Sequence, residues 1–241
     1  MNIIRVKDYD ELSEKACELL VNEMEKSDSS VLGLATGSTP EGLYQKLIDE
    51  YKKGNLSFSN VTTFNLDEYV GLAASDPNSY RYYMNEKLFS HVDLPDEQAF
   101  LPNGAAEDLE KECRDYEALI KDAGYVDLQV LGLGLNGHIG FNEPGTPVDS
   151  RTHVVELDES TRKANARFFK SMDDVPKKAL TMGIGTIMES RQIILLVSGE
   201  KKADAVKRLV NGMVSEEFPA SILQKHENAI LIADEAALSK V

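Results

Sequence analysis

The sequence predicts an α/β fold, namely a single-domain, three-layer α/β/α sandwich around a mostly parallel, Rossmann-like sheet. Short apolar runs of strand length alternate along the chain with longer segments of helical spacing. This alternation is typical of a parallel sheet that helices cover on both faces. The 241 residues suit one large domain, and neither a linker of biased composition nor an internal repeat divides them. We therefore predict one domain over residues 1–241.

The first elements follow from apolar spacing and turn residues. Residues 29–36 are a short apolar run, as expected of a strand buried on both faces, and residues 41–54 have helical spacing. Pro40 suits the first turn of this helix, with Thr39 as its cap. Residues 61–69 begin as a strand and end in polar side chains.

The later segments continue the same alternation. Helices are predicted over residues 78–92, 105–124, 161–169 and 200–212, with Gly124 closing the second and Gly212 the last. Strands are predicted over residues 126–134, 151–158, 191–199 and 228–234.

Three of the predicted strands run into unusual residues at their carboxyl ends. These stretches read ATGSTP (35–40), FNLDEY (64–69) and GLGLNGHIGFNEP (132–144). Ligands of parallel α/β sheets bind beyond the carboxyl ends of the strands. We therefore expect the three stretches to surround one site.

The last of these stretches matches a dinucleotide-binding fingerprint in letters only. Gly132, Gly134 and Gly137 fit G-x-G-x-x-G. A genuine fingerprint leads directly into a helix whose N-terminus faces the pyrophosphate. Here four glycines and prolines lie within residues 138–147, a density that stops a helix. We therefore expect no nicotinamide or flavin cofactor.

The same loop presents Asn136, His138, Asn142 and Glu143. A histidine can exchange a proton near neutral pH, and a carboxylate or amide beside one ring nitrogen leaves the other free for a substrate proton. The alternative is a surface loop with one polar histidine. The position at a predicted ligand edge favours a catalytic role for His138.

The stretch ATGSTP is suited to a phosphate. Its backbone amides and the hydroxyls of Thr36, Ser38 and Thr39, around Gly37, lie where a strand turns into a helix, and a helix N-terminus favours an anion. The alternative is an ordinary capped helix start. It is not a P-loop, because no Gly-Lys-Ser/Thr follows.

The stretch FNLDEY supplies Asp67 and Glu68. Adjacent side chains of an extended segment point to opposite faces, so we expect only one carboxylate to reach the cleft. A carboxylate at a strand end can act as a general base on carbon. The alternatives are a helix cap or a solvated pair.

Charge and cysteine content restrict the partners. The net charge is −15, from 41 acidic and 26 basic side chains, so nucleic acid is an unfavourable partner and an anionic substrate needs a few local cations. Cys17 and Cys113 lie in helical patterns, and we read them as reduced core residues rather than a metal or disulfide site. The N-terminal residues form neither a signal peptide nor a membrane span, so we expect a cytoplasmic protein without a membrane partner.

Taken together, the motifs resemble the glucosamine-6-phosphate deaminase family, also called glucosamine-6-phosphate isomerases. LATGSTPEGLY, TFNLDEYVGL, NSYRYYM and GLGLNGHIGFNEPG occur in the order that the family has, and the resemblance extends over essentially the whole chain. It implies conversion of glucosamine 6-phosphate and water to fructose 6-phosphate and ammonia, in amino-sugar catabolism. It implies neither a metal nor an organic cofactor.

The resemblance also implies catalytic roles. His138 holds the place of the histidine that helps open the pyranose ring, and Glu143 that of the carboxylate that tunes and orients it. Asp67 matches the base that moves a proton between carbon 2 and carbon 1. Many members have aspartate where this chain has Asn136. An amide cannot carry negative charge, so we expect Asn136 to orient the ring rather than carry a proton.

For the substrate's phosphate, the resemblance implies binding by Ser38 and Thr39 together with Arg167 and Lys202, which would supply the local cations. The polar segment 157–176, which contains Arg167, is expected to fold over the substrate as a lid, the alternative being an amphipathic surface helix.

Regulation is expected to differ from that of the longer, hexameric members, which N-acetylglucosamine 6-phosphate activates. Those members have basic residues where this chain has His153 and Val155, and they extend beyond the position of Val241. We expect no such activation, and a monomer or small homo-oligomer.

Two other functions fit parts of the sequence. A 6-phosphogluconolactonase-like hydrolase would open a lactone by water attack and would need no base such as Asp67. A non-catalytic sugar-phosphate sensor would normally carry a partner-binding or basic DNA-binding segment, which is not apparent in this chain.

Overall fold

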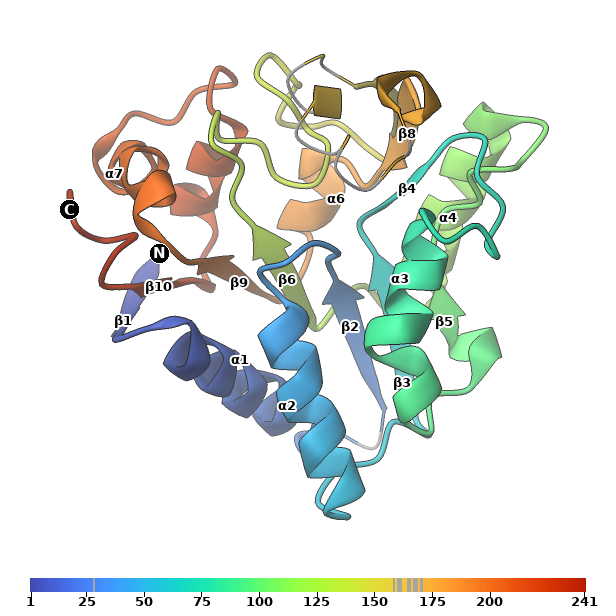
Figure 1. The fold of residues 1–241 in the computed structure, drawn as a ribbon, viewed down its shortest axis with the longest axis horizontal. Helices are drawn as coiled ribbons and strands as arrows, with labels where there is room; N and C mark the ends of the chain where they lie inside the picture. The colour runs from blue at the N-terminus through green and yellow to red at the C-terminus, as the bar shows by residue number, and fades with distance from the viewer. Residues whose placement is uncertain (28, 158, 160–161, 164–165, 167–168, 170) are drawn as a thin grey trace.

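The computed structural model describes residues 1–27, 29–157, 159, 162–163, 166, 169 and 171–241. Its centre is a seven-stranded sheet in the order β1-β10-β9-β6-β2-β3-β5, in which neighbouring strands are parallel. Helices flank the sheet (Figure 1). The strands are β1 (Asn2–Val6), β2 (Ser30–Leu34), β3 (Val61–Asn65), β5 (Ala99–Phe100), β6 (Leu128–Gly132), β9 (Gln192–Val197) and β10 (Ala229–Asp234).

The helices between these strands confirm the predicted α/β class. They are α1 (Tyr9–Met24), α2 (Glu41–Lys52), α3 (Tyr80–Lys87), α4 (Leu109–Asp122), α6 (Ile184–Met188) and α7 (Ala203–Asn211). Short 3-10 segments are η1 (Phe89–His91), η2 (Asp96–Gln98), η4 (Met172–Asp174), η5 (Glu200–Lys202) and η6 (Pro219–Lys225). None of the helices in the described part of the chain is long and apolar enough to cross a membrane.

A second, smaller sheet lies near the carboxyl ends of the large one. It is antiparallel, in the order β4 (Asp67–Tyr69), β8 (Lys178–Thr181) and β7 (His153–Glu156). The chain passes from one sheet to the other at Leu66, whose N–H donates to the Leu34 carbonyl of β2 (3.1 Å) and whose carbonyl accepts from Met182 (2.6 Å). Asp67, the next residue, therefore stands at the junction of the two sheets.

The core fills the space between the sheet and its helices. Phe64 of β3 stacks on Phe100 with ring centroids 5.0 Å apart, and meets Tyr116 of α4 edge-on at 5.7 Å. On another helix, Leu12 and Leu20 of α1 are fully buried. Each such side chain stabilises the fold by about 1.5–3 kcal/mol through removal of apolar surface from water. This packing makes the sheet a rigid base for the loops at its carboxyl edge.

The predicted strands over residues 29–36, 126–134, 191–199 and 228–234 are confirmed as β2, β6, β9 and β10, and residues 151–158 contain β7. The prediction for residues 61–69 is incomplete, because this segment breaks at Leu66 into β3 and β4. The sequence analysis also missed β1, β5 and β8.

Among the helices, residues 105–124 and 200–212 contain α4 and α7, the latter after the 3-10 segment η5. The helix predicted over residues 78–92 is too long: α3 ends at Lys87, because Leu88 has φ −147° and leaves the helical region. The predicted helix over residues 161–169 includes residues outside the described part of the chain.

The predicted cap of α2 is wrong. The N-cap residue is Pro40, without a side-chain hydrogen bond, rather than Thr39. The Gly42 N–H of the first turn is instead bound by the hydroxyl of Tyr9, 2.8 Å away in α1. A side chain distant in the sequence thus satisfies a donor that a local cap would otherwise take.

Cys17 and Cys113 are both free and buried, as the sequence predicts. Burial raises the pKa of each thiol to about 11. The thiols therefore stay protonated at neutral pH, which suits core residues better than nucleophiles.

Candidate active site

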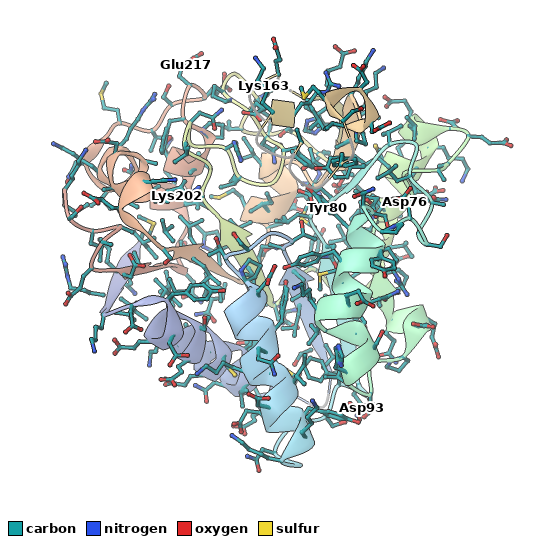
Figure 2. All side chains as sticks on the ribbon, viewed as in Figure 1. Asp76, Tyr80, Asp93, Lys163, Lys202 and Glu217 are labelled. Atoms are coloured by element: carbon teal, nitrogen blue, oxygen red, sulfur yellow. The ribbon has the colours of Figure 1, made fainter. Side chains whose placement is uncertain are left out.

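The three polar stretches meet as predicted. They line a cavity of about 570 Å³ at the carboxyl ends of β2, β3 and β6. Eight of the predicted site residues line it, namely Thr36, Gly37, Ser38, Thr39, Asp67, Asn136, His138 and Lys202. Glu143 lies behind Asn136, to which it is hydrogen-bonded. Arg167 lies outside the described residues. Figure 2 labels Lys202 and a further lining residue, Tyr80, on opposite sides of the strand ends.

The glycines of the 132–144 stretch make room for side chains. A Cβ atom at Gly134 would lie 2.3 Å from Nδ1 of His138, so only glycine lets the imidazole take this position. Gly137 has φ +90°, and its missing Cβ leaves space for the Phe218 ring. No helix forms within residues 138–152, all of which are described. The fingerprint thus fails as a dinucleotide motif, as the sequence analysis expected.

His138, Asn136 and Glu143 form a hydrogen-bonded relay. The Asn136 amide donates through Nδ2 to Oε2 of Glu143 (2.6 Å), and its Oδ1 lies 2.7 Å from Nδ1 of His138. An amide oxygen can only accept, so Nδ1 carries the ring proton and Nε2 has the free lone pair. The Glu143 carboxylate lies 3.6 Å from the same Nδ1 and favours the imidazolium whenever Nε2 takes a proton.

Asp67 is a buried carboxylate beside the cavity. Burial in the first place, and the charge of Glu68 in the second, raise its pKa from the ordinary value of 3.8 to about 8. A carboxyl group with such a pKa takes up and releases protons close to neutral pH, as a general base requires. Gly140 lies beside it, with φ +57°; a Cβ there would come to 3.0 Å from the Thr181 hydroxyl and into ordinary contact, at 3.6 Å, with Oδ2 of Asp67.

Glu68 points away from the cavity, which confirms that only one carboxylate of the pair reaches it. Its oxygens accept the backbone N–H groups of Tyr69 (2.8 Å), Tyr80 (2.9 Å) and Arg81 (3.0 Å). Two of these donors belong to the first turn of α3. Glu68 is therefore a helix cap supplied from a neighbouring strand.

Tyr80 is a lining residue that the sequence analysis missed. Its ring stacks on Phe141 with centroids 6.1 Å apart and lies 4.7 Å from the ring centroid of Tyr69. The stretch NSYRYYM has three tyrosines, and nothing in their spacing shows which one faces the cavity. The bond that Glu68 makes to the Tyr80 backbone fixes this choice.

Of the residues expected to hold a phosphate, Ser38, Thr39 and Lys202 line the cavity. Gly37 has φ +102°, which lets the chain turn sharply between β2 and α2. Lys202 reaches in from η5, and its Nζ donates to the Leu133 carbonyl at 2.5 Å. Burial lowers the pKa of Lys202. The turn before η5 is fixed by Asp234, which accepts from Ser198 Oγ (2.5 Å) and from the Gly199 N–H.

In the described part of the chain, no group of three or more His, Cys, Asp or Glu side chains is placed to hold a metal ion. Among the described residues, the lining of the cavity supplies the buried carboxylate of Asp67, the imidazole of His138 with a fixed tautomer, a turn rich in N–H and O–H donors, and Lys202.

Comparison with known proteins identifies relatives of this chain by sequence. Residues 7–232 match the family model of glucosamine-6-phosphate isomerases/6-phosphogluconolactonase. A protein of Shouchella clausii named glucosamine-6-phosphate deaminase is 60% identical over 239 residues, covering 99% of this chain and 97% of that protein. One of Bacillus subtilis, named glucosamine-6-phosphate deaminase 1, is 54% identical and covers 99% of both chains.

Solved structures give the same result. One described as a monomeric glucosamine-6-phosphate deaminase superposes with a TM-score of 0.98, at 53% identity over the full length of both chains. The 6-phosphogluconolactonase of Thermotoga maritima superposes with a TM-score of 0.76 at 20% identity, covering 97% of this chain and 99% of that one. The second likeness concerns the fold alone.

Proposed function

The chain belongs to the family of glucosamine-6-phosphate isomerases and 6-phosphogluconolactonases, and we propose that it is a glucosamine-6-phosphate deaminase. It converts glucosamine 6-phosphate and water to fructose 6-phosphate and ammonia, a step of amino-sugar catabolism that couples ketol isomerisation to hydrolytic loss of the amino group. Relatives of this name share 54–60% of their residues with the chain over nearly its whole length. The pairing of Asp67 with the His138 relay at one cavity is the observation that carries the proposal.

In the first step, His138 opens the pyranose ring. The lone pair on Nε2 accepts the proton of the O1 hydroxyl, and the imidazolium then delivers a proton to the ring oxygen, so that the bond between C1 and O5 breaks and an aldehyde forms. Asn136 holds the ring in the tautomer that this requires, and Glu143 stabilises the transient positive charge.

In the second step, Asp67 isomerises the open chain. Its carboxylate removes the proton from C2 while O1 takes up a proton, which gives an enolamine. The carboxyl then returns its proton to C1 as the amino group gives up one of its own, which leaves an imine at C2 and a hydroxyl at C1. Water then adds to the imine carbon and ammonia leaves, giving the ketose. A base whose pKa burial has raised to about 8 is matched to a weak carbon acid better than an ordinary carboxylate is.

The phosphate lies, in this proposal, against the donors of residues 36–39 and the ammonium of Lys202. Arg167 stays a proposed second cation, and the segment 157–176 a proposed lid over the substrate. The open wall of the cavity, which exposes Leu135 at 64%, leaves room for such a cover.

The lactonase alternative is less well supported. Its solved structures are about 20% identical and match in fold alone, and lactone hydrolysis gives no role to a base aimed at a substrate carbon. A binding-only sensor likewise gives no role to the relay that fixes the tautomer of His138.

The substrate assay that decides among the three offers the purified protein glucosamine 6-phosphate and 6-phosphogluconolactone in parallel. We expect equimolar ammonia and fructose 6-phosphate from the first, and no hydrolysis of the second above the spontaneous rate. Lactone hydrolysis without ammonia would overturn the proposal in favour of the lactonase, and binding without either reaction would favour the sensor.

Two further parts of the proposal concern the state of the protein in solution. A solved structure with 53% identity is described as monomeric, which supports a monomer here. The −15 net charge and the family's metabolic role support a cytoplasmic location without nucleic acid or membrane partners. Sedimentation equilibrium tests the first of these, with one species of 26.7 kDa as the expected result.

A further inference from the structure

Tyrosine hydroxyls surround the outer side of the turn that follows β2. Tyr83 of α3 donates to the Gly37 carbonyl (2.6 Å). Tyr9 of α1 lies 2.9 Å from the Ser38 carbonyl and 3.0 Å from that of Thr39. Tyr44 of α2, which is fully buried, donates to the Ala35 carbonyl at 2.5 Å. Three helices thus each send one hydroxyl to a short backbone segment.

These contacts fix the direction of the backbone N–H groups as well. In a planar trans peptide, the carbonyl of one residue and the N–H of the next point in opposite directions. Tyr83 on the Gly37 carbonyl therefore sets the N–H of Ser38, and Tyr9 on the Ser38 carbonyl sets that of Thr39. These N–H groups point away from the tyrosine hydroxyls. Ser38 and Thr39 line the cavity that contains Asp67 and His138, which neither Tyr9 nor Tyr83 lines.

Among the described residues, the carbonyls of Gly37, Ser38 and Thr39 accept hydrogen bonds from these tyrosine hydroxyls alone. A second cavity, of about 720 Å³, lies behind the turn and is lined by Tyr9, Ser38 and Thr39 among others. The turn thus separates two cavities, and glycine at position 37, which lacks a Cβ and has φ +102° here, permits several backbone conformations. The hydroxyls of Tyr9 and Tyr83 are the contacts that select one of them.

We propose that Tyr9 and Tyr83 are positioning residues for the substrate's phosphate: they hold the Ser38 and Thr39 N–H groups toward the cavity without touching the substrate. This inference rests on the proposed function only for the identity of the phosphate ester. The anion-binding geometry that it describes applies equally to inorganic phosphate, because both present the same oxygens to the same donors.

The test uses Tyr9→Phe, Tyr83→Phe and the double variant, with Tyr82→Phe as a matched control. Tyr82 is the neighbour of Tyr83 in α3 and is 36% exposed. Each variant removes the hydrogen bonds of one tyrosine to the turn, so the N–H groups of the turn lose part of their fixed orientation. We therefore expect KM for glucosamine 6-phosphate to rise about 3- to 10-fold in each single variant and more in the double variant. The value of kcat should stay within about twofold of wild type. Tyr82→Phe should match wild type in both constants.

Inorganic phosphate provides a readout that does not depend on turnover. We expect the Kd for inorganic phosphate, obtained from the dependence of the melting temperature on phosphate concentration, to increase by the same factors as KM. A lower melting temperature in all three variants, with KM and phosphate binding unchanged, would show that the tyrosines only stabilise the fold and would overturn the inference. If wild type released no ammonia but phosphate binding weakened as stated, the proposed function would fail and the inference would stand.

Discussion

The amide of Asn136 sets the protonation of His138. The Asn136 NH2 group faces Glu143, because a carboxylate can only accept hydrogen bonds. The Asn136 oxygen therefore faces Nδ1 of the imidazole. An aspartate at this position would bring two carboxylates to within 2.6 Å, where they could not both be ionised. The amide therefore places the only charge of the relay on Glu143, one step further from the ring.

Replacing Asn136 by leucine removes the acceptor for the ring proton while keeping a branched side chain with the same number of heavy atoms. We expect kcat for ammonia release to fall about 10- to 100-fold, because the imidazole then samples the wrong tautomer and other orientations. Asn136→Asp keeps an acceptor beside Nδ1 and should lose less than Asn136→Leu. Wild-type kcat in the leucine variant, measured at saturating substrate, would mean that the relay has no part in the reaction.

The raised pKa of Asp67 predicts how activity depends on pH. The base form of the carboxylate accumulates as pH rises toward about 8. We expect log kcat/KM to rise with a slope near one per pH unit below this value and then level off. A profile of kcat/KM from pH 5 to 9 tests this, and a flat profile between pH 5 and 7 would contradict it.

The raised pKa of Asp67 also predicts that this carboxyl lowers the free energy of unfolding at neutral and higher pH. Its pKa is about 8 in the folded protein and near 3.8 in the unfolded chain, so between these values the unfolded chain has lost a proton that the folded protein keeps. The free energy of unfolding therefore falls as pH rises through this window, by about 1.4 kcal/mol per pH unit for this group alone. We expect Asp67→Asn to melt at a higher temperature than wild type at pH 8, and the gap to shrink at pH 5. Equal melting temperatures at both values would show that the carboxyl is not perturbed.

Site residues that belong to a sequence motif could be predicted, whereas those whose position depends on tertiary contacts could not. Asp67 and His138 could be found because each stands in a polar stretch at the end of an apolar strand. Tyr80 could not, because its place in the cavity depends on Glu68, twelve residues away, and on the packing of Phe141. The role of Thr39 as a helix cap was predicted wrongly for a related reason, since Tyr9 takes the donor of Gly42 from another helix.

Among the elements, β4 and α3 act as one unit. Glu68 in β4 accepts three backbone N–H groups, two of them from the first turn of α3, and so links the strand that carries Asp67 to the helix that carries Tyr80. A glutamine at position 68 would keep one acceptor oxygen but would put an NH2 group in place of the other. The N–H groups of that NH2 group would then face backbone N–H groups, which cannot accept a hydrogen bond. The charge of Glu68 also contributes to the raised pKa of Asp67.

Glu68→Gln should therefore have two separable effects. We expect the free energy of unfolding in urea to fall by about 1–3 kcal/mol, because buried N–H groups lose their acceptors. We also expect the limb of the pH profile assigned to Asp67 to move to lower pH, because the neighbouring negative charge is gone. The pKa of Asp67 should still stay well above its ordinary value, since burial is the larger cause of its rise. A limb that moves to higher pH would contradict this assignment.

The strands β2, β6, β9 and β10 of the large sheet could be predicted because each is a mainly apolar run, whereas β1 and β5 were not predicted. In the small sheet β7 was predicted, but the separate strand β4 and the strand β8 were not. β4 and β8 have three and four residues and mix polar with apolar side chains, and what makes them strands is their pairing with each other, Asp67 with Thr181 for example. Such non-local pairing leaves little local pattern in the sequence.

In the whole molecule, the segment around residues 151–155 has no free cation for an effector. The guanidinium of Arg151 is bound to Glu117 (2.6 Å) and to Glu189 (2.7 Å). His153 lies with Nδ1 at 2.8 Å from the Arg151 carbonyl, and Val155 packs on the small apolar cluster of Tyr69 and its neighbours. The contacts of this segment are those of a structural connection between α4 and the small sheet.

We therefore expect hyperbolic substrate dependence that N-acetylglucosamine 6-phosphate leaves unchanged, since its phosphate would meet an arginine already held by two carboxylates. Initial rates over a range of glucosamine 6-phosphate, with and without the acetylated sugar, test this. A sigmoidal curve that becomes hyperbolic on addition would mean that an activating site exists elsewhere.

Ammonia release from glucosamine 6-phosphate by wild type, Asp67→Asn and His138→Gln is the decisive measurement. We expect turnover by wild type and losses of at least about 100-fold in kcat for both variants, with inorganic phosphate still raising the melting temperature of all three. Turnover that survives in Asp67→Asn would contradict the central claim that this buried carboxylate moves the proton between carbon 2 and carbon 1.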